Sequence, residues 1–127
     1  MSLDILPVFP QDCQLIQSYG DRKFRISDKQ YEQALLVFPQ KIIPWSPIDE
    51  NNLRLDDFED VLNTKPAIEI LLLGCGKTTL FVPLTLRDAI KERGVVLEPM
   101  DTGAACRTFN VLLGEDRRIA AALMLVD

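Results

Sequence analysis

The chain has 127 residues, of which 47% are hydrophobic and 26% are charged. This length and composition are typical of a single globular domain with its own core, and they exclude a disordered or fibrous protein. Nineteen acidic residues against fourteen basic ones give a net charge of −5, which repels phosphate backbones and anionic lipid surfaces. We therefore expect no nucleic acid partner, and we interpret the basic pair Arg117 and Arg118 as a solvated strand end.

The cysteine and histidine inventory limits the possible chemistry. The three cysteines lie far apart, at positions 13, 75 and 106, and the chain has no histidine. This set predicts neither a disulfide framework nor a transition-metal site, and it excludes Ser-His-Asp and Cys-His catalysis. We expect no metal, no cofactor and a reducing compartment.

Two features of the sequence bear on location. The first residues, Met1 to Pro7, have neither the basic segment nor the apolar stretch of a signal peptide. The longest apolar run, 119–126, is far shorter than the roughly twenty residues of a membrane-spanning helix. These features predict a soluble, cytoplasmic protein without a transmembrane segment; they leave the protein partner and the oligomeric state open.

The first third of the chain predicts an antiparallel β-meander. Strands are expected at 14–19, 22–26 and 31–38, with a further extended segment at 40–45. The turns between them are expected at Gly20-Asp21 and Ser27-Asp28. Phe24 and Ile26 alternate with charged residues, which is the period of a strand with one face in water.

From about residue 56 the apolar period becomes helical. Asp56 followed by Glu59 has the form of a capping box and starts a short helix. The predicted elements that follow are a strand at 68–73, a helix at 84–93, a strand at 95–98, a helix with Thr102 as N-cap that ends at Gly114, and a strand at 119–126. Because a β-α-β crossover is right-handed, the first two of these strands should be parallel. The predicted fold is mixed α+β, a meander followed by a mixed-sheet β-α-β-α-β layer, in one domain of 1–127.

The segment 74–79, Gly-Cys-Gly-Lys-Thr-Thr, has the composition of a nucleotide-binding loop but not its spacing. A Walker loop needs glycine five positions before Gly76, where this chain has Leu71. A dinucleotide-binding loop needs its third glycine at Thr79, and Pro83 interrupts the chain before the next helix. No nucleotide cofactor is predicted.

A pocket is expected where two loops meet at the carboxyl ends of the parallel strands. Backbone N–H groups at the start of the third helix attract anions, and Arg107 would act as an anion clamp facing the glycine loop. The candidate pocket residues are Gly74, Cys75, Gly76, Asp101, Thr102, Gly103, Cys106, Arg107 and Asn110. In the alternative interpretation, Asp101 and Thr102 only cap the helix, the small residues only pack closely, and Arg107 forms a surface ion pair. No catalytic residue is assigned, because Cys106 has no histidine to act as its base.

The segments 100–113, MDTGAACRTFNVLL, and 70–76, ILLLGCG, resemble the signature of an uncharacterised Mth-type domain family. This family includes the mitochondrial complex I (NADH dehydrogenase) assembly factor 3 and an adipogenesis-associated Mth-domain protein. The resemblance runs from about residue 15 to the C-terminus, so 1–13 is expected to be an extension and 14–127 the family domain. It implies a three-layer fold on a mixed sheet and no established reaction. Members often carry Thr at the position of Cys75 and Tyr at that of Phe109.

Two functions of different class follow from these observations. The first is a non-catalytic protein-interaction or assembly-factor-like domain, which the missing histidine and the defective nucleotide motifs favour. The second is a small-molecule or anion-binding protein, enzymes included, with a pocket between 74–76 and 101–110. An open polar cleft there would favour the second function, whereas a filled site beside an exposed apolar patch would favour the first.

Overall fold

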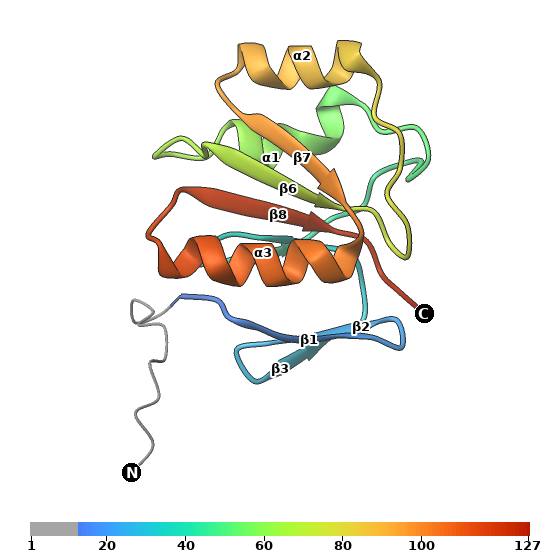
Figure 1. Ribbon diagram of the computed structural model, residues 1–127, viewed down its shortest axis with the longest axis vertical. Coiled ribbons are helices and arrows are strands. Elements are labelled where there is room, and N and C mark those ends of the chain that lie inside the picture. The colour runs from blue at the N-terminus through green and yellow to red at the C-terminus, as the bar shows by residue number, and fades with distance from the viewer. Residues whose placement is uncertain (1–12) are drawn as a thin grey trace.

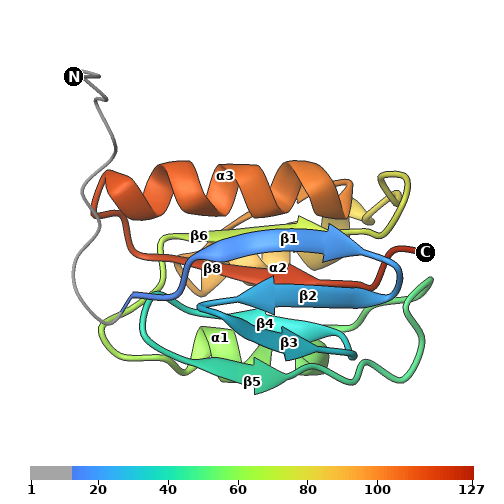
Figure 2. The same cartoon turned by 90° about the horizontal axis from the view of Figure 1, so that it is seen from below.

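The computed structural model describes residues 13–127, which form two β-sheets and a set of helices in three layers (Figure 1, Figure 2). The strands are β1 (Ile16–Gly20), β2 (Lys23–Ile26), β3 (Lys29–Tyr31), β4 (Leu35–Val37), β5 (Ile42–Pro44), β6 (Ile70–Gly74), β7 (Val96–Met100) and β8 (Ile119–Leu123). The helical segments are the 3-10 turn η1 (Leu55–Phe58) and the α-helices α1 (Glu59–Leu62), α2 (Leu84–Glu92) and α3 (Thr102–Gly114).

Strands β1, β2 and β3 form the smaller sheet, an antiparallel meander as predicted. Each hairpin turns through two residues with positive φ, Asp21 and Arg22 in the first, Ser27 and Asp28 in the second. Such turns match the right-handed twist of the paired strands. The side chain of Gln17 in β1 accepts a 2.7 Å hydrogen bond from the Asp28 backbone, which fixes the second turn against the sheet.

The larger sheet has the strand order β5-β4-β8-β6-β7. Strand β6 is parallel to both β7 and β8, so the predicted parallel crossover is confirmed. The last strand of the chain, β8, lies in the middle of the sheet and pairs antiparallel with β4 on its other side. Every residue of β8 is buried, because layers of the protein cover both faces of the sheet.

Two apolar cores fill the spaces on either side of the larger sheet. One lies between the sheet and α1 and α2, around Phe58, Leu71 and Ile90. The other lies between the sheet and a layer made of α3 and the small sheet, around Phe24, Leu72 and Phe109. Figure 1 shows α2 at one end of the molecule and the small sheet at the other, with the strands of the larger sheet between them. The predicted three-layer mixed fold is confirmed.

The prediction of one strand at 31–38 is wrong, because the chain changes sheets within this segment. Tyr31 ends β3 in the small sheet, whereas Leu35–Val37 forms β4 in the larger one. The three residues of β4 are all buried, while Lys29 and Gln30 in β3 are exposed. A continuous strand would have kept both stretches in one sheet, but the apolar stretch is stabilised by a position covered on both faces.

Two predicted helix starts also need correction. The first helical segment begins at Leu55, where the carboxylate of Asp57 accepts a 2.8 Å hydrogen bond from the backbone of Arg54, so Asp56 and Glu59 do not form the capping box. The N-cap of α3 is Asp101, whose carboxylate accepts a 2.8 Å hydrogen bond from the Ala104 N–H. Within residues 13–127, no helix has the length and apolar content needed to cross a bilayer.

Candidate functional site

The glycine loop after β6 and the start of α3 lie next to each other, as the sequence predicts. Gly74 pairs in register with Met100 at the end of β7 and with Leu123 at the end of β8. The carboxyl ends of three parallel strands therefore meet at one edge of the sheet, and the segments 74–76 and 101–103 leave from this edge. We call the contact between these two segments the 74/102 junction.

Thr102 lies at the centre of the 74/102 junction, and its side chain is fully buried. Its hydroxyl accepts a 2.8 Å hydrogen bond from the Gly76 N–H and donates one of 2.8 Å to the Met124 carbonyl. Its own N–H donates to the Gly76 carbonyl at 2.9 Å. Two further backbone hydrogen bonds close the junction, Met124 N–H to Gly74 C=O at 2.9 Å and Cys75 N–H to Met100 C=O at 2.8 Å.

The 74/102 junction is filled by protein atoms. Gly74, Cys75, Gly76, Thr102 and Gly103 are all buried. A Cβ added to Gly74 would lie 3.1 Å from the Thr102 Cα, so glycine is needed here for close packing of two backbones. At the 74/102 junction, Asp101 caps the helix and the small residues allow two backbones to pack closely. This is the arrangement expected if these residues have a structural role and do not form a pocket.

The other three candidate residues, Cys106, Arg107 and Asn110, line a separate groove between α3 and β1. The groove has a volume of about 500 Å³ and is completed by residues 16–19. A helix turns by about 100° per residue, so Arg107 lies roughly 140° around the axis from Thr102, which faces the glycine loop. Its guanidinium instead donates a 3.3 Å hydrogen bond to the Tyr19 hydroxyl. The expectation that Arg107 faces the glycine loop is wrong for this reason.

The polar contacts of this groove fasten β1 to α3. The amide of Asn110 donates to the Ile16 carbonyl at 2.7 Å and accepts from the Ile16 N–H at 3.1 Å, as a neighbouring strand would. The ring of Tyr19 lies over Gly103, where an added Cβ would collide with the Tyr19 hydroxyl. Asn110 and Gly103 are thus placed to dock the small sheet on the helix.

The thiol of Cys106 is buried between α3 and the sheet. Burial raises its pKa to about 12, while the nearby Arg107 lowers it and the nearby Asp101 raises it. Burial also raises the pKa of the Cys75 thiol. Both thiols are therefore protonated at neutral pH, which makes them poor nucleophiles.

This raised pKa predicts a loss of stability in alkali. The unfolded thiol ionises near pH 9, whereas the native Cys106 thiol stays protonated up to about pH 12. The stabilising effect of the protonated native thiol is complete below about pH 9 and is lost as the pH rises towards 12, by up to about 1.4 kcal/mol per pH unit. Urea unfolding of the wild type and of Cys106→Ala at pH 7 to 11 measures this loss of stability. The two proteins share all other titratable groups, so a difference between their pH dependences comes from the Cys106 thiol. Parallel curves for the two proteins would contradict the assignment.

An exposed apolar loop follows the glycine loop and runs into Leu84, the first residue of α2. Phe81 is 88% exposed and Leu84 is 69% exposed, and Pro83 between them is also on the surface. Val82 and Leu86 alternate with them and are buried. We call Phe81, Pro83 and Leu84 the apolar loop. The exposure of this segment was not predicted. The signal in the sequence is a run of five apolar residues, 80–84, of which a helix that begins at residue 84 can bury only a part.

The comparisons with known proteins identify the family. A family model described as a protein of unknown function (DUF498/DUF598) matches residues 16–124. The chain belongs to this family. The NADH dehydrogenase [ubiquinone] 1 alpha subcomplex assembly factor 3 of Danio rerio is 33% identical over 110 residues, which cover 87% of this chain and 63% of that protein. The chain thus spans less than two thirds of the length of this relative.

Solved structures of similar proteins share the fold. A crystal structure of an outer membrane protein from Bartonella henselae is 36% identical, with a TM-score of 0.81 over 94% of this chain and all of that chain. A Bordetella pertussis protein described as an Mth938-like domain is 22% identical, with a TM-score of 0.79 over 98% of this chain and 92% of that chain. The predicted family membership is confirmed by the family model and by the assembly-factor relative, and the Bordetella pertussis domain shows the predicted Mth-type fold.

Proposed function

We propose that this domain is a non-catalytic protein-interaction module of the assembly-factor type, which binds a partner protein through the apolar loop. The observation that carries the proposal is the exposure of Phe81 and Leu84, two large apolar side chains three residues apart. Burying each side chain against a partner would be favourable by about 1.5–3 kcal/mol. Exposed apolar side chains that are grouped in this way are typical of protein interaction sites.

The apolar loop is held in place for such a contact. Two buried side chains belong to the core under α2 and hold the loop against it: Val82, within the loop, and Leu86, in the first turn of α2. Beside Phe81 lies a hollow of about 140 Å³ between residues 50–53 and 80–83. This hollow has room for one side chain of a partner, next to the aromatic ring. A preorganised anchor of this kind lowers the entropic cost of binding.

The relatives support a protein partner. The Danio rerio relative is named as an assembly factor of the NADH dehydrogenase complex. We carry over from it the general role, binding a subunit of a multi-subunit complex, as part of the proposal. The anion-binding alternative has less support at the 74/102 junction, where the Thr102 hydroxyl and the Gly76 N–H are bonded to each other and residues 74–76 and 102–103 are buried. The cytoplasmic location remains a prediction.

Phe81→Glu is expected to weaken partner binding by roughly 30-fold, which corresponds to the loss of an interface hot spot of about 2 kcal/mol. The tagged protein is used to capture partners from the source organism, and the retained proteins are quantified by mass spectrometry for the wild type and the variant. Binding of each retained partner is then measured with purified proteins by calorimetry.

The matched control is Val111→Glu, which places the same charge at a 60% exposed apolar position on α3. The proposal is supported if the Val111→Glu control retains a partner that Phe81→Glu does not. Both variants must keep the thermal midpoint of the wild type for this comparison. Equal retention by Phe81→Glu and the wild type would overturn it. Sedimentation tests self-association: if Phe81→Glu converts a dimer to a monomer, the apolar loop binds a second copy, and the proposed role is rejected.

A further inference from the structure

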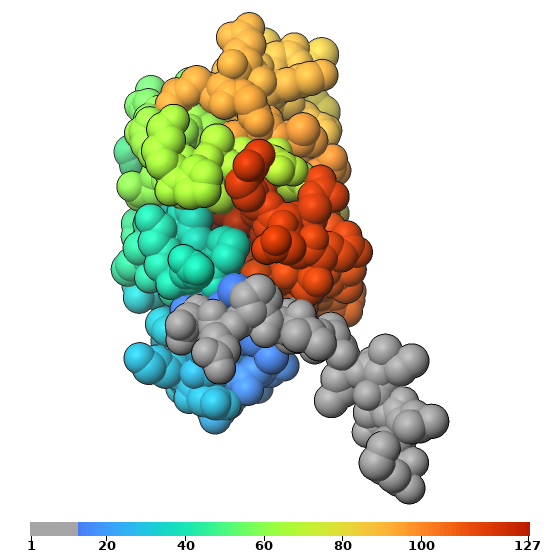
Figure 3. Space-filling view, turned by 90° about the vertical axis from the view of Figure 1, so that its left-hand side faces the viewer, coloured from blue at the N-terminus to red at the C-terminus, as the bar shows by residue number. Residues whose placement is uncertain are grey.

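A second hollow lies at the opposite end of the larger sheet, where β6 and β8 begin. It has a volume of about 560 Å³ and is formed mainly by the turn between β4 and β5, the loop before β6 and the loop between α3 and β8. In Figure 3 these segments, teal at 38–41, yellow-green at 64–68 and red at 113–118, meet on the face towards the viewer. We call this hollow the 38/118 pocket.

The floor of the 38/118 pocket is apolar. Phe38, Ile68 and Leu113 contribute to its lining although they are at most 4% exposed, so they form the bottom of the hollow. Pro39 and Pro66 add further apolar surface to the lining. A volume of this size and an apolar lining are typical of sites that bind small molecules.

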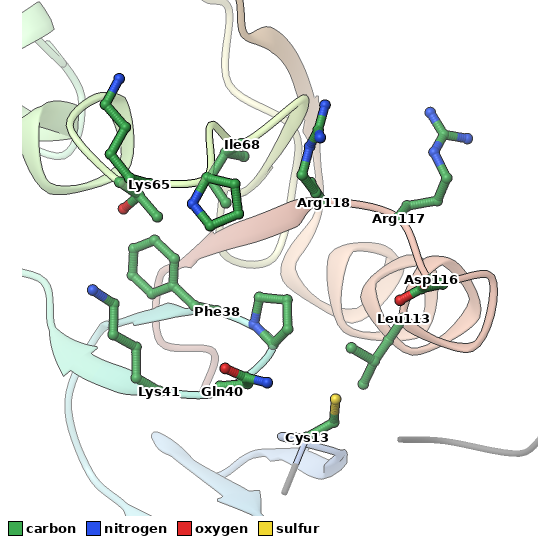
Figure 4. Close-up of a pocket in the computed structure, with 13 residues that line it drawn as sticks. Cys13, Phe38, Gln40, Lys41, Lys65, Ile68, Leu113, Asp116, Arg117 and Arg118 are labelled. Carbon is green, nitrogen blue, oxygen red and sulfur yellow. The ribbon is translucent and has the colours of Figure 1, made fainter. Parts of the chain in front are cut away.

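The rim of the 38/118 pocket is positively charged. Figure 4 shows the side chains of its four cationic residues around the apolar floor, namely Lys41, Lys65, Arg117 and Arg118. Two carboxylates lie near them, Asp116 in the lining and Glu69, which pairs with both arginines. Four positive and two negative charges give a local formal charge of +2, in a chain whose net charge is −5.

Some of these cations are held in position by neighbouring groups. The Lys41 Nζ lies 4.7 Å from the centre of the Phe38 ring, a cation–π contact. Glu69 accepts from the Arg118 guanidinium at 2.9 Å and from that of Arg117 at 3.5 Å. Each guanidinium has five N–H donors, and the two arginines share one carboxylate. Both arginines therefore keep N–H donors that can bind a further anion.

We propose that the 38/118 pocket binds a small amphiphilic anion, a carboxylate or phosphate group joined to a compact apolar body. The anionic group binds among the cations of the rim, and the apolar body lies on the floor made by Phe38, Ile68 and Leu113. This site is separate from the apolar loop and does not depend on the function proposed above.

The chemistry of the pocket separates this class of ligand from simpler ones. The cations are exposed, so each pair with a bare inorganic ion contributes only about 0–1 kcal/mol and is screened by salt. A purely apolar molecule would fill the floor but leave the charges of the rim unused. Only a ligand with both parts uses the buried side chains and the net positive charge together.

The test uses the full chain labelled with ¹⁵N and titrated with octanoate and octyl phosphate in NMR experiments. We expect saturable shifts at residues 38–41, 64–68 and 113–118, and none at 74–76. Octan-1-ol should bind at least threefold more weakly than octanoate, because it forms no ion pair. Acetate should give no saturable shift, because it has no apolar body of useful size.

Two variants test the two parts of the pocket. The double variant Lys41→Gln, Lys65→Gln is expected to weaken octanoate binding by roughly three- to tenfold, because it removes two exposed cations. Lys91→Gln on α2 is the matched control and should bind as the wild type does. Gln40→Trp places a large ring in the lining and should abolish binding while the rest of the spectrum stays unchanged.

Several outcomes would overturn the proposal. No saturable shift with either octyl anion, or equal binding of octan-1-ol and octanoate, would exclude it. Binding to phosphatidylglycerol vesicles without binding to free octanoate or octyl phosphate would assign the rim to a membrane surface instead. Binding of a short glutamate-rich peptide without binding of the octyl anions would assign it to an acidic protein segment.

Discussion

Replacing Thr102 with valine is expected to lower the free energy of unfolding by about 3 kcal/mol, although the two side chains have almost the same shape. Valine removes the hydroxyl that pairs with the Gly76 N–H and the Met124 carbonyl, both at 2.8 Å in a fully buried position. A buried backbone group left without a partner costs about 1–3 kcal/mol. The expected loss for Thr102→Val is therefore larger than the loss of about 1 kcal/mol that follows when the hydroxyl of an N-cap threonine is removed.

Urea unfolding followed by circular dichroism measures this effect. Thr102→Ser keeps the hydroxyl and should lose clearly less stability than Thr102→Val. Thr108→Val on the same helix is the matched control, since Thr108 is half-buried and should change stability by no more than about 0.5 kcal/mol. A Thr102→Val protein within 0.5 kcal/mol of the wild type would show that the hydroxyl does not hold the 74/102 junction together.

Phe109→Ala is expected to destabilise the protein by about 4 kcal/mol, the usual range for loss of a buried aromatic side chain being roughly 3–5 kcal/mol. Phe109 is 0% exposed and packs in the core between α3, the larger sheet and the small sheet. Its loss leaves a cavity where three elements meet. An inward shift of α3 to fill this cavity would strain the hydrogen bonds that tie the helix to its neighbours, from Asn110 to Ile16 and from Thr102 to Gly76. Domains of this size have total stabilities of about 5–15 kcal/mol, so the variant should be close to unfolding.

The control for this prediction is Val111→Ala, two residues further along the same helix. Val111 is 60% exposed, so its truncation should change stability by no more than about 0.5 kcal/mol. Thermal and urea unfolding of both variants against the wild type measure the difference. Similar losses for the two variants would mean that α3 does not bury the face that contains Phe109.

Part of the candidate site was predictable because it depends on strand direction. The apolar run 68–73 and the helix before the next strand predict a parallel crossover, and parallel strands end at the same edge of a sheet. The contact between the glycine loop and the start of α3 follows from this. The side of α3 on which Arg107 lies does not follow, because it depends on the rotation of the helix. That rotation is set by Thr102 against the loop and by Asn110 against β1.

The sequence by itself determined the fold class, the order of most elements and the membership of the family, since local apolar periods, turn residues and the segments 70–76 and 100–113 are properties of neighbouring residues. The tertiary structure decided which strands share a sheet, with β4 leaving the meander to pair with β8. It also decided that the 74/102 junction is filled, and that cations from positions 41, 65, 117 and 118 surround one hollow. Each of these features brings together residues that are far apart in the chain. Their contacts depend on how the layers pack, and no local pattern in the sequence predicts that packing.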